Sequence, residues 1–166
     1  MAKSSIKFPG VGPYIAQLNR LSDMSLIIIE RAVAKGAKPV ADACKENLKG
    51  LSARSNYAAI NAWKQGRKSP LTEEQKKGLV ESMGLAPIRD DKGYINTKLG
   101  FDGYNEVVTK RWPKGQPNAL IARVLESGSS AMDKQPFVRP AVLATRKDAE
   151  KEMKKYLDDE IGKIMK

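Results

Sequence analysis

The chain has 166 residues, enough for one domain with a buried core and too few for two of ordinary size. Its net charge is +11, and it contains no histidine and one cysteine, Cys44. This composition lacks the commonest general base and metal ligand, and it excludes an internal disulfide. No apolar run has the length of a membrane span or signal peptide, so we expect one soluble domain (1–166), made in a cytoplasm, with no membrane partner.

The first residues, 1–12, are predicted to form an irregular arm, because Phe8-Pro9-Gly10 interrupts regular structure. Pro13 can begin a short helix, and Ser22 or Asp23 can cap a longer second helix.

The second helix has the clearest pattern in the chain. Its apolar residues are spaced by three or four positions, as on one face of a helix: Leu26, Ile29, Val33, Ala37, Val40, Cys44, Leu48 and Leu51. Gly36 and Pro39 lie within this stripe, so we expect a kink or break near residue 38. Cys44 is expected to be a small buried side chain and not a nucleophile, because no histidine can activate it.

Basic residues occupy another face of the same helix, which we call the basic face. Its members are Arg31, Lys35, Lys38, Lys45 and Lys49. Such a face could follow the phosphates of a nucleic acid. The alternative, which we favour, is an ordinary solvated lysine face, because no aromatic residue is interleaved for base stacking.

The apolar periodicity of the second predicted helix ends near Gly50. Residues 50–70 are polar and are predicted to form a long loop that could contact a partner. Thr72 and Gln75 match a capping box and predict a helix that ends at Gly84.

A β-hairpin is predicted over residues 86–101, because residues 90–93 have turn chemistry and the residues after them alternate. Asn118 is expected to cap a short helix that Gly128 ends, and Pro140 to begin the last helix. Together these elements predict an α+β fold, with a long N-terminal helix and a C-terminal helix packed on a small antiparallel β-sheet.

Little in the sequence supports catalysis. Neither of the two common phosphate-binding glycine motifs occurs. Acidic residues gather at Asp90-Asp91 and at residues 158–160, where an active site or metal site is conceivable, but a turn and a solvated helix face explain them more simply. We therefore predict that the chain is not an enzyme and has no catalytic residue, cofactor or metal.

The most specific stretch is residues 118–143. A helix there ends in Glu-Ser-Gly-Ser, a short loop follows, and Pro-Phe-Val-Arg-Pro-Ala leads into the last helix. This pattern resembles the tail-completion (head–tail joining) proteins of long-tailed, siphovirus-type bacteriophages, and residues 94–104 resemble the family's preceding strand. Residues 50–85 look like an insertion. The motif residues are Glu126, Gly128, Pro136, Phe137, Arg139 and Pro140.

The motif suggests a scaffold role. Pro136 and Pro140 restrict the backbone around Phe137, which we expect to fill the core between sheet and helix. Arg139 is predicted to pair with Glu126, and the alternative is two unrelated solvated charges.

The resemblance implies a structural virion protein with no turnover. Its subunits would form a homo-oligomeric ring, expected to be a hexamer, at the head-proximal end of the tail tube. There the ring would dock with tail-tube and head–tail connector or stopper proteins, in the virion neck, after assembly in the host cytoplasm. It could also contact passing DNA without sequence preference. The alternative, suggested by the charge, is a small basic nucleic-acid-binding protein.

Overall fold

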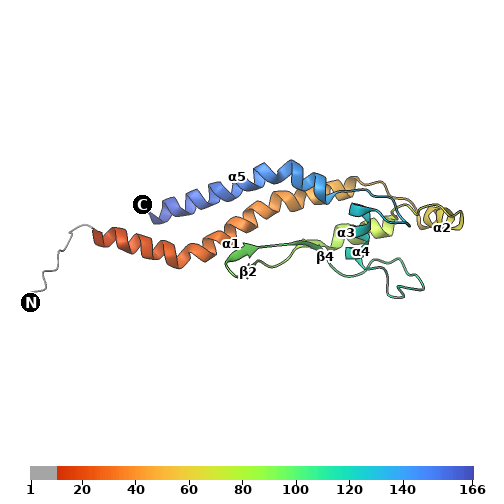
Figure 1. Cartoon of the computed structure of the whole chain (residues 1–166), viewed down its shortest axis with the longest axis horizontal. Helices are drawn as coiled ribbons and strands as arrows, with labels where there is room; N and C mark the ends of the chain where they lie inside the picture. Colours follow the sequence, from red (N-terminus) through yellow and green to blue (C-terminus); the bar gives the residue numbers. More distant parts are fainter. Residues whose placement is uncertain (1–10) are drawn as a thin grey trace, which may run out of the picture.

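The computed structural model describes residues 11–166 and has an elongated shape (Figure 1). Helix α1 (Val11–Gly50) and helix α5 (Val138–Ile164) pack side by side in opposite directions. The shorter elements gather around the C-terminal end of α1, and one hairpin extends back along it (Figure 1). Within the described residues, no helix combines the length and apolar composition required to cross a membrane.

Helix α1 is one continuous helix of 40 residues, so the two predicted helices and the break near residue 38 are wrong. Pro39 lies inside the helix, and packing against α5 offsets the missing backbone hydrogen bond. Ser22 and Asp23, the predicted caps, lie inside this helix and so begin no helix of their own. The predicted arm, 1–12, lies outside the described residues except for its last two positions, which are helical.

The buried face of α1 differs from the predicted stripe in its N-terminal half. Ile28 and Ala32 are buried there, whereas Leu26 and Ile29 are 47% and 41% exposed. In the C-terminal half Cys44 and Leu48 are fully buried, as predicted.

Close approach between the two long helices explains this register. A Cβ atom built on Gly36 would lie 2.8 Å from the Met153 sulfur and 3.1 Å from the Ala149 carbonyl oxygen. Small residues therefore line the crossing of α1 and α5. Because Gly36 must face α5, the positions one turn and two turns before it, Ala32 and Ile28, face α5 as well.

Two short helices follow α1. Helix α2 (Asn56–Lys64) lies within the segment predicted to be a loop, and Ser55 caps it by accepting a hydrogen bond from the Ala58 N–H. Helix α3 (Glu73–Ser82) begins with the predicted capping box: the Thr72 hydroxyl accepts from the Gln75 N–H, and the Gln75 side chain accepts from the Thr72 N–H. Its end at Ser82 precedes the predicted end by two residues, because a strand starts there.

The β region consists of two short antiparallel ladders. Strands β2 (Arg89–Asp91) and β3 (Tyr94–Asn96) form the predicted hairpin, whose two turn residues both have positive φ. Strands β1 (Met83–Leu85) and β4 (Leu99–Phe101) pair outside it. The predicted α+β class, with two long terminal helices and a small antiparallel β region, is confirmed.

The C-terminal helices begin elsewhere than predicted. Pro117 is the N-cap of α4 (Asn118–Ser127), and Asn118 is instead a buried residue whose amide donates to the Asp102 carbonyl at 2.9 Å. Gly128, with φ of 79°, ends α4 as predicted. Helix α5 begins at Val138, so Pro140 is its third residue and not its first.

The main core lies where the end of α1 meets α3, α4 and the start of α5. Its buried residues are Leu48, Leu71, Leu79, Ile121, Ala122, Leu125, Met132 and Phe137. The β1–β4 ladder covers this core through Met83 and Phe101.

Substitution of Gly115 tests the backbone conformation of residues 104–117. Its φ is +94°, and a Cβ atom there would collide with the backbone carbonyl oxygen of Asn105. We expect Gly115→Ala to lower the free energy of unfolding by about 3 kcal/mol, measured by urea denaturation. The matched control is Gly66→Ala, which has φ of +65° but open space and should cost about 1 kcal/mol. Equal losses in the two variants would contradict the collision.

Candidate functional site

The motif residues converge on the junction between α4 and α5. Phe137 is fully buried, as predicted, and its ring lies edge-to-face against Phe101, with ring centroids 5.9 Å apart. The Phe137 carbonyl accepts a hydrogen bond from the Asn47 side chain at 3.1 Å. One residue thereby connects the β region, the end of α1 and the start of α5.

Glu126 caps the N-terminus of α5. Its carboxylate accepts hydrogen bonds from the backbone N–H groups of Phe137 at 3.0 Å, Val138 at 3.1 Å and Arg139 at 2.9 Å. Glu126 and Arg139 are therefore linked, but through the Arg139 backbone; in the described chain their side chains form no ion pair. A negative charge at this position also interacts favourably with the helix dipole.

The cap accounts for the whole first turn of α5. An α-helix leaves four N-terminal N–H groups without intrahelical partners, here those of residues 137–140. Glu126 accepts from three of them, and the fourth residue, Pro140, has no N–H to satisfy. The spacing of the acidic residue and the second proline in the motif thus has a direct physical reason.

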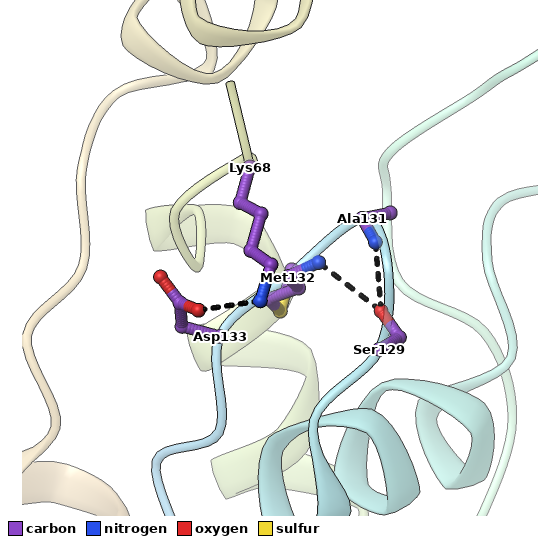
Figure 2. Close-up of polar contacts among 5 residues, drawn as sticks. All are labelled: Lys68, Ser129, Ala131, Met132 and Asp133. Atoms are coloured by element: carbon purple, nitrogen blue, oxygen red, sulfur yellow. Dashed lines mark hydrogen bonds and ion pairs between the residues drawn. The ribbon is translucent and has the colours of Figure 1, made fainter. Parts of the chain in front are cut away.

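The loop between α4 and α5 is fixed at both sides (Figure 2). The Ser129 hydroxyl accepts from the N–H groups of Ala131 and Met132, each at 3.1 Å. Lys68 forms an ion pair with Asp133 at 2.8 Å, which ties the segment before α3 to this loop. Lys68 belongs to residues 50–85, interpreted as an insertion, so this segment contacts the loop that contains part of the motif.

The remaining motif residues lie at the surface of the junction. Pro136, Arg139 and Pro140 are exposed, and Gly128 is half-buried. None of them is among the residues that line the apolar groove between α2 and α4, described below. Their arrangement supports a rigid joint between helices.

The basic face remains on one side of α1, because the helix is continuous through Pro39. Arg31, Lys35 and Lys38 are exposed. Lys45 is half-buried, and Lys49 pairs with Glu46 at 2.7 Å. Within residues 11–166 Arg31, Lys35 and Lys38 form no ion pair, and three aligned basic side chains are a weak platform for phosphate binding.

An apolar groove of about 460 Å³ lies between α2, α4 and residues 106–109. Trp63 and Ile60 of α2 form one wall and are 74% and 51% exposed, and Leu120 and Val124 of α4 form another. Of the residues that line the groove, Glu106 alone is charged. This groove was not predicted, because residues 56–64 were expected to be a loop; the spacing of three between Tyr57, Ile60 and Trp63 was the available signal.

Comparisons of the chain with models of protein families, with curated proteins and with solved structures found no match. Among residues 11–166, no group of three or more acidic, histidine or cysteine side chains is placed to hold a metal ion. Function must therefore be argued from the motif and from the surfaces of the fold.

Replacing Glu126 tests how much its cap contributes to the stability of the fold. Glu126→Ala leaves three N–H groups at the start of α5 without their acceptor, so we expect the free energy of unfolding to fall by about 2 kcal/mol. Glu126→Gln retains one acceptor oxygen and should lose less. Arg139→Ala is the control and should change stability by less than about 0.5 kcal/mol in the same urea titration. A large loss in Arg139→Ala would instead support an ion pair between the side chains.

Cys44 tests the burial of the helix pair. Burial, and secondarily the charge of Glu126, raise the pKa of the Cys44 thiol above its ordinary value. We expect a thiol reagent to label the folded chain at least about 100-fold more slowly than the chain in denaturant. Because the folded thiol keeps its proton to higher pH than the unfolded one, the free energy of unfolding should fall as pH rises above about 9. The Cys44→Ala variant should lack this part of the pH dependence of the free energy of unfolding. Rapid labelling of Cys44 in the folded chain would contradict its burial.

Proposed function

We propose that this chain is a structural adaptor that completes the tail of a long-tailed bacteriophage and joins it to the head connector. The observation that carries the proposal is that the motif residues fix the start of α5 to the rest of the fold. Glu126 and Pro140 together complete the first turn of α5, and Phe137 locks this turn to α1 and the β region. The residues behind the resemblance to tail-completion proteins thus have structural roles, as expected of an assembly protein.

The chain also has exposed apolar surfaces of the kind that a subunit of an assembly buries against its neighbours. Apolar side chains are exposed at both ends of the molecule: Tyr14, Ile15 and Leu18 at the start of α1, and Tyr57, Ile60 and Trp63 on α2. Clustered exposed apolar residues are typical of surfaces that other proteins cover. In this proposal they contact neighbouring subunits in a ring, expected to be a hexamer, and tail-tube or connector proteins in the virion neck.

The alternative function is nucleic-acid binding. The net charge of +11 favours it, but no aromatic residue is interleaved with the basic face to stack on bases. The exposed aromatic residues of α2 border an apolar groove whose charged residue is acidic. These observations support the adaptor over the nucleic-acid-binding protein, while loose contact with passing DNA along the basic face is compatible with either.

The deciding experiment is electron microscopy of phage particles assembled without this protein. We expect full heads and finished tails that stay separate, and joined particles once the wild-type chain is supplied. Purified chain should bind duplex DNA weakly at both low and high salt. Normal particles without the chain, or tight DNA binding that weakens steeply with salt, would contradict the adaptor function.

A further inference from the structure

A second cleft, of about 630 Å³, lies on a different side of α2 from the apolar groove. Helix α2 contributes Ala58 and Ala62 to it, whereas Ile60 and Trp63 of the same helix line the apolar groove. The other lining residues come from the segments that flank α2 and from the loop after α4: Arg54, Arg67, Lys68, Pro70 and Asp133. We call this the arginine cleft. Three cations and one carboxylate surround its small apolar side chains.

Backbone hydrogen bonds fix the positions of the two arginines. The Arg54 N–H donates to the Leu71 carbonyl at 2.8 Å, and the Arg54 carbonyl accepts from the Glu73 N–H at 3.1 Å. The Arg67 N–H donates to the Ala62 carbonyl at 2.8 Å. Because Arg54 precedes α2 and Arg67 follows it, the fold around α2 brings both to one cleft. A site whose backbone is fixed in advance loses less entropy when a ligand binds.

The cations of the cleft are available to a ligand. Within residues 11–166 neither Arg54 nor Arg67 forms an ion pair, and both are exposed. The Arg67 side chain donates to Gln65, which leaves most of its five N–H donors unused. Lys68 pairs with Asp133 at 2.8 Å (Figure 2), but this pair is exposed, so little free energy opposes its rearrangement around an anion.

The charges of the cleft indicate the class of ligand. Arg54, Arg67 and Lys68 carry three positive charges and Asp133 carries one negative charge, so the lining has a net charge of +2. A guanidinium group matches the oxygens of a phosphate and can bind two of them through parallel hydrogen bonds. Two arginines suit one phosphate dianion or two successive phosphodiesters of a DNA strand, whereas a carboxylate carries a single charge.

We propose that the arginine cleft is a phosphate-binding site, with Arg54 and Arg67 as its main ligands. Phosphate groups have two sources, the backbone of DNA and a free phosphate compound, and the experiment below distinguishes them. This inference goes beyond the proposed adaptor function and does not depend on it. In an adaptor that DNA passes through, the arginine cleft and not the basic face of α1 would make the stronger phosphate contact.

Substitution of the arginines tests the cleft. Binding of a short fluorescent duplex DNA to the full-length chain is measured by anisotropy at low salt, where two or three cations should give a weak dissociation constant of about 10–100 µM. Arg54→Gln and Arg67→Gln should each raise this constant by about fivefold or more. Arg54→Lys keeps the charge but loses the planar fork, and should raise it by about threefold.

The matched control is Arg123→Gln, which removes the same charge from an exposed position of α4 outside the cleft. It should change the dissociation constant by less than about twofold. Asp133→Asn should have the opposite effect and tighten binding by about threefold, because it removes the carboxylate that competes with the ligand for Lys68. All of these side chains are exposed, so circular dichroism should show that every variant folds.

Titration with inorganic phosphate, followed through the arginine Nε–H signals by NMR, identifies the source. Binding much weaker than that of DNA supports the DNA backbone, and binding of similar strength supports a free phosphate compound. Absence of both DNA and phosphate binding would overturn the site, as would equal effects of Arg54→Gln and Arg123→Gln. Polyglutamate that binds as tightly as a duplex of equal charge would assign the cleft to an acidic protein, and would overturn the proposal as well.

Discussion

A carboxylate from α4 completes the first turn of α5. The packing of α5 against α1 starts from this turn. Glu126 accepts from the three N–H groups that this turn offers, and the buried ring of Phe137 sits directly beside them. Without the carboxylate, the start of α5 would hold unsatisfied donors next to an apolar core, which is costly. The first turn of α5 is therefore anchored to α4 at the edge of the core.

Beyond the junction, the pairing of α1 and α5 relies on small residues. Gly36 approaches the backbone of α5 so closely that a side chain there would displace Met153. This contact consumes one narrow face of α1 and leaves other apolar residues uncovered, among them Leu26 and Ile29. A long arm with a rigid base and uncovered apolar positions is well suited to contacts with other subunits, which agrees with the proposed assembly role.

Local chemistry made several elements predictable. The Thr72–Gln75 capping box, the turn at residues 90–93 and the end of α4 at Gly128 each depend on a few neighbouring residues, and each is confirmed. Predictions failed where long-range packing decides. Pro39 is retained in a continuous helix because α5 supports it, and α2 forms in an expected loop because Ala62 is buried and the Ser69 hydroxyl bonds the Ala59 carbonyl.

By itself, the sequence determined the α+β class, the two long terminal helices and the burial of Phe137, because periodicity and turn residues act over short distances. Only the tertiary structure decided which face of α1 is buried and what Glu126 binds. Residues 26–29 are four consecutive apolar residues that point to different sides of the helix, so periodicity cannot tell which of them is buried. The close contact at Gly36 does decide it. Likewise, Glu126 and Arg139 suggest an ion pair from charge alone, but the fold brings the carboxylate to the backbone N–H groups of α5.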